Sequence, residues 1–158
     1  MLMEHRGRRP EVHENAYIAA TAVVVGDVLI EEGARVLHGA VLTAEDGRIT
    51  VGADTVVMEH ALIRSREQWP VTVGRSVIVG PHTHLNGTAI GDGAFIATGA
   101  ALFPGSRVGA GAEVRFNAVV HVRTHVAAGT TVPIGWIAVG DPAQVFSPDR
   151  HDEIWVIQ

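Results

Sequence analysis

The sequence predicts an all-β protein, a parallel β-helix of about seven coils that ends in a short C-terminal α-helix. The first observation is a series of apolar residues spaced six apart, a period that neither an α-helix nor an alternating strand produces. Ala often stands two positions before these residues and Gly often follows them. Such hexapeptide repeats are typical of a β-helix, in which each unit buries its apolar residue only by stacking on its neighbours. With one five-residue step before Ile90, the longest series contains Val73, Val79, Leu85, Ile90, Ile96, Leu102, Val108, Val114, Val120, Val126 and Val132.

Two earlier series with the same spacing predict the remaining coils. The first extends from Val12 to Leu42, and the second extends from Val51 to Ile63. At about three hexads per turn, the coils begin near residues 12, 30, 51, 73, 90, 108 and 126. We therefore expect one β-helix domain over residues 12–146, preceded by a polar and poorly ordered lead-in over residues 1–11.

Two breaks in the spacing predict loops on the coil. The first contains Thr43 to Arg48, a polar turn sequence, and the second contains Arg64 to Pro70 and is long enough to protrude. Loops on a rigid scaffold are frequent positions for binding groups.

The tail, residues 147–158, predicts a short helix from about Pro148 to Val156. Ser147 suits the N-cap, and Pro148 suits the first helical position. The helix is expected to cover sheet surface or a sheet edge that would otherwise be open to pairing. Its apolar residues are expected to pack back on the coil: Ile154, Trp155 and Ile157.

Composition excludes several classes of function. The net charge of −5 argues against a nucleic-acid surface. All 12 basic residues are arginine and cysteine is absent, so lysine Schiff-base chemistry, a cysteine nucleophile and a thiolate metal site are excluded. The charged N-terminus is unlike a secretory signal, and no apolar run reaches the length of a membrane span. We expect a soluble cytoplasmic protein without membrane or nucleic-acid partners.

Several segments resemble the γ-class carbonic anhydrase family along nearly the whole chain. They are Gly39–Leu42, Ile49–Gly52, Val79–Gly80, Gly87–Asp92 and the closing Gly140–Ala143. The resemblance implies a left-handed coil, a homotrimer, and active sites between subunits. It also implies zinc held by three histidines, but those positions fall on Arg64, Asn86 and Pro81 in this sequence. The family's arginine, aspartate and glutamine fall on Thr43, Glu45 and Met58. A zinc site at the family's own positions is therefore excluded.

Three histidines nevertheless lie close to the lost ligands. His60 and His82 share one hexad position in successive coils, and His84 and Asn86 are expected to point outward from one strand. In a trimer of the family type, His84 of one subunit would face His82 and His60 of the next. Three neutral imidazoles with an open fourth position suit catalytic zinc or another divalent transition metal. The alternative is that these histidines only pack or form hydrogen bonds at a subunit interface.

Glu59, Arg64 and Asn86 are the candidate catalytic residues around this site. Glu59 would be a general base or an ion-pair partner. Arg64 would bind a carboxylate or another anion, or would pair across the interface with Glu59 or Glu45. Trp69 and Phe116 would line a ligand pocket or pack at the interface.

Three functional hypotheses follow. The first is a divergent γ-carbonic-anhydrase-like trimer that hydrates or hydrolyses a small carbonyl compound at an intersubunit site, with metal dependence if the histidines bind one. The second is a coenzyme-A-dependent acyltransferase that uses His82 or His84 as base, although Gln144 stands where a basic residue is common. The third is a non-catalytic trimeric binding or assembly module. The sequence alone does not decide whether the protein is an enzyme.

Overall fold

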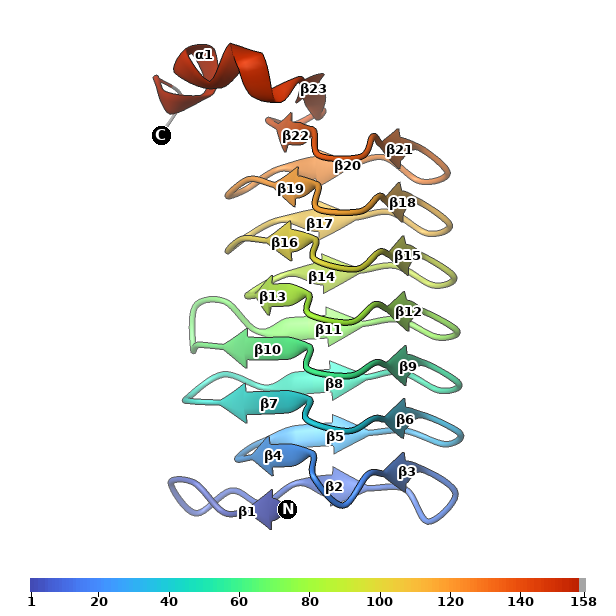
Figure 1. Cartoon of the computed structure of the whole chain (residues 1–158). Coiled ribbons are helices and arrows are strands. Elements are labelled where there is room, and N and C mark those ends of the chain that lie inside the picture. The colour runs from blue at the N-terminus through green and yellow to red at the C-terminus, as the bar shows by residue number, and fades with distance from the viewer. Residues whose placement is uncertain (157–158) are drawn as a thin grey trace.

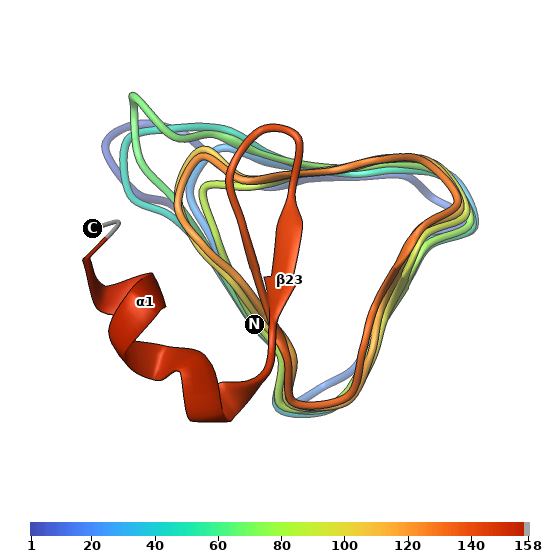
Figure 2. The ribbon, with the colours of Figure 1, turned by 90° about the horizontal axis from the view of Figure 1, so that it is seen from above.

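The computed structural model describes residues 1–156, which form a parallel β-helix with a triangular cross-section (Figures 1 and 2). Each coil contributes one strand to each of three sheets, and the chain rises with a left-handed turn. The predicted fold class is therefore confirmed. The flat sides of the prism are the three sheets, and its corners are short turns.

The first sheet contains β1 (Leu2–Met3), β4 (Val23–Val25), β7 (Val41–Ala44), β10 (Leu62–Ser65), β13 (His84–Asn86), β16 (Ala101–Leu102), β19 (Val119–Val120), β22 (Ile137–Val139) and β23 (Gln144–Phe146). The second contains β2 (Glu11–Val12), β5 (Val28–Ile30), β8 (Ile49–Val51), β11 (Val71–Val73), β14 (Ala89–Ile90), β17 (Arg107–Val108) and β20 (His125–Val126). The third contains β3 (Tyr17–Ile18), β6 (Arg35–Val36), β9 (Val56–Val57), β12 (Ile78–Val79), β15 (Phe95–Ile96), β18 (Glu113–Val114) and β21 (Thr131–Val132).

The register of the second sheet confirms the predicted coil starts. Val12 lies opposite Ile30, Ile30 lies opposite Val51, and Val51 lies opposite Val73. The same ladder continues from residue 73 through 90 and 108 to 126. Both breaks in the spacing lie where the chain passes from the first to the second sheet, although β7 and β10 include their first residues. The loop between β10 and β11 stands out from the prism at this corner (Figure 2).

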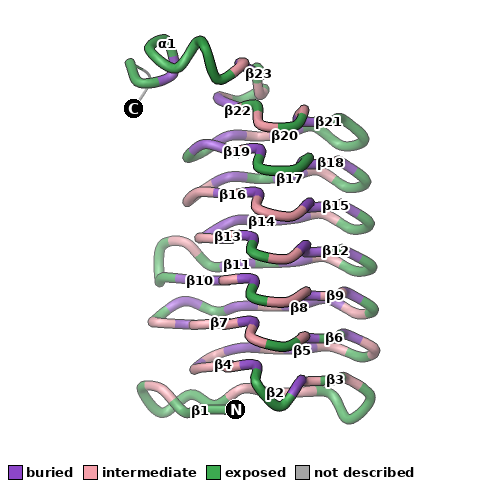
Figure 3. The backbone as a smooth tube through the Cα atoms, viewed as in Figure 1, coloured by how far each residue is buried: buried purple, intermediate pink, exposed green. Residues whose placement is uncertain are grey.

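The core is a single column inside the prism. Inward residues alternate with outward ones along each strand, so buried positions recur at the same place in every coil (Figure 3). The largest fully buried side chains include Ile30, Leu42, Ile63, Leu85 and Ile96. Stacked aliphatic residues of similar size fill the narrow interior.

The N-terminal segment is ordered, which corrects the expected poorly ordered lead-in. β1 pairs with β4, with Leu2 opposite Val24, and so adds part of a coil beneath the first complete one. His5 and Arg8 then close a tight turn through an antiparallel bridge. Leu2 and Met3 are exposed, so the surface at the N-terminal end of the coil is apolar there.

The C-terminal segment contains a 3₁₀ turn, Pro148–Arg150, and the helix α1, His151–Trp155. Ser147 is at the N-cap position, but its side chain makes no capping hydrogen bond. The sheet edge is covered by β23, which pairs antiparallel with β22, rather than by the helix. Ile154 packs on Val139 and Phe146, whereas Trp155 is 73% exposed. Trp155 therefore does not pack on the coil as expected, and the expectation for Ile157 lies outside the described residues.

None of the helices within residues 1–156 has the length and apolar character needed to span a membrane.

Candidate functional site

His60 and His82 meet at the corner that precedes the first sheet. Their rings stack with centroids 5.2 Å apart and planes 12° from parallel. Both residues adopt left-handed backbone conformations, with φ of 58° and 55°. Gly39 and Gly99 occupy the same corner in neighbouring coils, also at positive φ. Because Asn, Asp and His tolerate this conformation better than most residues, the corner geometry itself accounts for part of the histidine pattern.

His84 and Asn86 lie at the two ends of β13, with their side chains on the outer face of the first sheet. The His84 ring stacks on Phe103, with centroids 5.9 Å apart. Its Nε2 atom is buried and has no hydrogen-bond partner among the described residues. Burial lowers the pKa of His84 below its ordinary value, and the charge of the nearby Arg64 lowers it further. His84 is therefore neutral at pH 7 and can accept a proton or a hydrogen bond.

Arg64 lies opposite Asn86 on the neighbouring strand β10. Its Nη2 atom donates a hydrogen bond of 2.6 Å to Oε1 of Glu45. Arg66 approaches the other carboxylate oxygen of Glu45 at 3.5 Å. The ion pair that the sequence suggested for Arg64 thus forms within one chain, with Glu45 and not with Glu59. Glu59 is half-buried beside His60 and forms no ion pair within residues 1–156.

Trp69 lies along the corner between the first and second sheets, in the loop between β10 and β11. A Cβ atom on Gly87 would come within 2.5 Å of the Trp69 Cβ, and one on Gly105 would come within 2.7 Å of its indole ring. Arg123 lies over the same ring at 5.8 Å. Two glycines in successive coils therefore make room for this side chain, and it packs within its own chain. Phe116 is 47% exposed.

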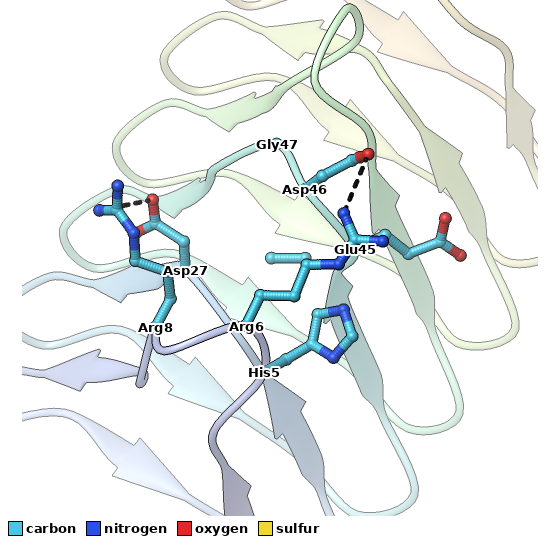
Figure 4. Close-up of a pocket in the computed structure, with 8 residues that line it drawn as sticks. His5, Arg6, Arg8, Asp27, Glu45, Asp46 and Gly47 are labelled. Atoms are coloured by element: carbon cyan, nitrogen blue, oxygen red, sulfur yellow. Dashed lines mark ion pairs between the residues drawn. The ribbon is translucent and has the colours of Figure 1, made fainter.

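A cavity of about 160 Å³ lies behind Glu45, under the N-terminal turn (Figure 4). Arg8 pairs with Asp27 on one side of it at 3.7 Å, and Arg6 pairs with Asp46 on the other at 3.6 Å. All four side chains are partly exposed, so these pairs add little stability. The cavity shares Glu45 with the Arg64 ion pair but is lined by none of the three candidate metal ligands.

The residues of one chain do not fit a zinc ion. At the family's ligand positions, Arg64 already pairs with Glu45, and Pro81 has no donor atom in its side chain. The lone pairs of His60 and His82 lie in nearly parallel planes and do not converge, while His84 packs on Phe103. Within residues 1–156 no group of three histidine or acidic side chains is placed to hold a metal. A relocated site at His60, His82 and His84 would need a second subunit and different ring orientations.

The six-residue repeat and three-sided coil define this chain as a hexapeptide-repeat β-helix protein. No protein-family model matches it. Two mitochondrial proteins of Arabidopsis thaliana, gamma carbonic anhydrase 2 and 1, are 29% and 30% identical to it over 97% of its length. The chain spans only 55% and 56% of their lengths, about half of each relative. The carnitine operon protein CaiE of Escherichia coli K12 is 24% identical over 94% of this chain and 72% of its own length.

Solved structures agree with the fold. A hexapeptide transferase family protein from Anaplasma phagocytophilum superimposes with a TM-score of 0.69 over 99% of this chain and 89% of its own, at 24% identity. At this identity the likeness concerns the fold alone. The repeat, the coil and these relatives make the chain a hexapeptide-repeat protein that is similar to gamma carbonic anhydrases over nearly its whole length.

Proposed function

We propose that the chain forms a homotrimer that hydrates or hydrolyses a small carbonyl compound at a site between subunits. The observation that carries this proposal is the buried, unpartnered Nε2 atom of His84, on the same outer face as Arg64 and Asn86. A neutral imidazole beside two hydrogen-bond donors suits the addition of water to a carbonyl group. The imidazole accepts the proton of the water, and the donors stabilise the oxygen that becomes negative.

Each side chain has a role in this proposal. His84 is the general base, since its lowered pKa keeps it unprotonated at neutral pH. Arg64 and Asn86 face the carbonyl oxygen, and Glu45 holds the guanidinium in place. Glu59, at the adjoining corner, is the second candidate base. No step requires a metal, and zinc held by His60, His82 and His84 across two subunits stays a separate prediction.

The outer face of the first sheet supports a second subunit. One column of outward residues along this sheet is almost entirely aliphatic and only half-buried in the single chain: Val23, Val41, Leu62, Ala101, Val119 and Ile137. An apolar stripe of this length is unusual for an isolated surface and is typical of an interface. His84 belongs to the same column, so a neighbouring subunit would close the space above it.

The test is hydrolysis of a small activated ester, such as 4-nitrophenyl acetate, by the purified oligomer, with carbon dioxide hydration measured in parallel. His84→Gln should lower kcat/KM at least about a hundredfold, the usual size of a general-base contribution. His151→Gln, at an exposed histidine in α1, is the matched control and should leave the rate unchanged. A rate no higher than that of free imidazole, or equal rates for both variants, would contradict the proposal.

Acyl transfer from coenzyme A is the second candidate, because a neutral His84 would equally activate an acceptor hydroxyl or amine. Position 144, an exposed glutamine, provides no cation for the cofactor's phosphates. Saturable binding of acetyl-coenzyme A, with transfer to an added amine, would favour this reaction over hydrolysis. A chain with neither activity would be a binding or assembly module.

A further inference from the structure

Asn86 stands at the centre of a patch with two unlike sides. Arg64 is its partner on the preceding strand. Leu85 lies opposite Leu102 on the following strand, so Phe103 takes the outward position next to Asn86 one coil later. His84, two residues before Asn86, leans toward Phe103 and stacks on it with planes 24° apart. An amide therefore lies between a guanidinium and a wall of two flat rings.

The cationic side of this patch has hydrogen-bond donors that are not used by Glu45. One carboxylate, that of Glu45, serves both Arg64 and Arg66, at 2.6 Å and 3.5 Å. Glu45 is thus shared between two guanidinium groups, while Asp46 and Glu67 stand beside Arg66. Arg64 uses one terminal nitrogen for Glu45, and a guanidinium has five N–H donors. The side chain is 33% exposed, so its remaining donors can reach a ligand on the outer face.

We propose that this patch binds a small monocarboxylate with a flat apolar group. The carboxylate accepts hydrogen bonds from Arg64 and from the Asn86 amide, and the apolar group lies against Phe103 and His84. A bidentate contact between a guanidinium and a carboxylate gives both affinity and orientation. The patch is part of the proposed catalytic site, and this inference rests on the proposed function because a second subunit would close the patch. The inference adds the class of ligand, a carboxylate, which is also the class of product that ester hydrolysis releases.

The charges around the patch favour a monoanion over a dianion. Glu45 is already in contact with Arg64, so a second negative charge on the ligand would meet this carboxylate. The net charge of the chain, −5, acts in the same direction. The stacked rings favour a planar apolar group, because offset and edge-to-face contacts add to simple burial.

Benzoate is the probe, and benzamide is its uncharged counterpart of the same shape. Calorimetric titration of the purified protein should give saturable benzoate binding, with benzamide at least about tenfold weaker. Arg64→Gln should weaken benzoate at least about tenfold as well. The matched control is Arg35→Gln, since Arg35 lies over the Tyr17 ring at 5.8 Å on the third sheet and should not affect binding. Equal binding of benzoate and benzamide, or of the native chain and Arg64→Gln, would overturn the inference.

Two further variants separate loss of the binding site from a defect in folding and from loss of the proposed activity. Phe103→Leu keeps an apolar side chain and should weaken benzoate while leaving acetate unchanged, which a fold defect would not do. His84→Gln should abolish ester hydrolysis yet reduce benzoate affinity by less than about tenfold. If benzoate binds in an Arg64-dependent way but no ester is hydrolysed, the carboxylate site is supported and the proposed function is contradicted. Hydrolysis that benzoate does not inhibit would retain the function and remove this site.

Discussion

The guanidinium of Arg64 and the carboxylate of Glu45 lie 2.6 Å apart, joining the first polar loop to the outer face of the first sheet. The two residues come from successive coils, and Arg64 faces Asn86 on its other side. At the position where the γ-class family places a zinc ligand, this chain therefore has a fixed organic cation held by a carboxylate. An arginine at this position offers hydrogen-bond donors and has no lone pair for a metal.

Removal of this carboxylate should alter the position of Arg64 more than the stability of the fold. The two side chains are 33% and 39% exposed, so solvent screens their attraction. We expect Glu45→Gln to lower the free energy of unfolding by less than about 1 kcal/mol in urea titrations. The Nε–H resonance of Arg64 should shift clearly in the same variant. Glu4→Gln, which removes the exposed pair with Arg9, is the control and should leave the Arg64 resonance in place.

Metal analysis tests the relocated zinc site directly. The three imidazoles do not converge in one chain, so bound metal requires a second subunit. In protein purified without added zinc, a content below about 0.1 metal ion per subunit that His82→Ala does not change would remove the relocated site. One metal ion per trimer interface, lost in His82→Ala and in His84→Ala, would show instead that a second subunit completes the site. Exposed His13 provides the control substitution.

The pKa of His84 predicts how stability depends on pH. Burial and Arg64 hold this pKa below the ordinary value of 6.5. Above that value both the folded and unfolded chains have a neutral His84, so its contribution to stability is constant. As the pH falls below 6.5, the unfolded chain binds a proton first, and the free energy of unfolding decreases until the folded pKa is reached.

Thermal unfolding between pH 5 and 8 should therefore show a stability loss toward acid that is smaller in His84→Gln. Burial also lowers the pKa of His121, so His121→Gln should remove a second part of the same slope. The double variant should have the flattest profile. An unchanged slope in His84→Gln would mean that the imidazole is already solvated and would remove the basis for a neutral general base.

The coil could be predicted from the sequence because the inward positions hold aliphatic residues at a fixed spacing of six. Val51 opposite Val73 follows from counting, even across a loop. The site could be predicted only in part. The stacking of His60 on His82 followed from their shared hexad position, but the contact of His84 with Phe103 depends on side-chain direction, which spacing does not specify.

The Trp69 packing was missed although a signal existed. Gly87 and Gly105 stand at equivalent corners of successive coils, and together they leave the space that the indole fills. The exposure of Trp155 was missed for another reason. Its position depends on β23, a strand that returns antiparallel and so breaks the repeat from which the rest was predicted. The regular repeat makes the coils of a β-helix easy to predict. A strand that reverses direction at the end of the coil does not follow the repeat and cannot be predicted from it.

Core packing beneath the site should dominate stability. Leu85 is fully buried between His84 and Asn86, and Leu85→Ala should lower the free energy of unfolding by about 2–5 kcal/mol. Ile78→Ala is the comparison, because Ile78 is 42% exposed on the third sheet and should cost less than about 1 kcal/mol. Chemical denaturation measures both. Similar losses in the two variants would mean that the interior adjusts to a missing side chain.

Gly39, at the corner one coil before His60, allows a test of the stack between His60 and His82. A control glycine with a similar backbone conformation, Gly111, matches the conformational cost of the substitution. Gly39 and Gly111 both have positive φ, 73° and 65°, so alanine costs about 1 kcal/mol at either position. A Cβ on Gly39 would come within 2.3 Å of the His60 Nδ1 atom, whereas a Cβ on Gly111 meets no atom within 4 Å. The exposed His60 ring can rotate away, so Gly39→Ala and Gly111→Ala should lose nearly equal stability. Only Gly39→Ala should shift the imidazole resonances of His60 and, through the stack, of His82. A shift of His60 with none of His82 would show that the two rings are not in contact in solution.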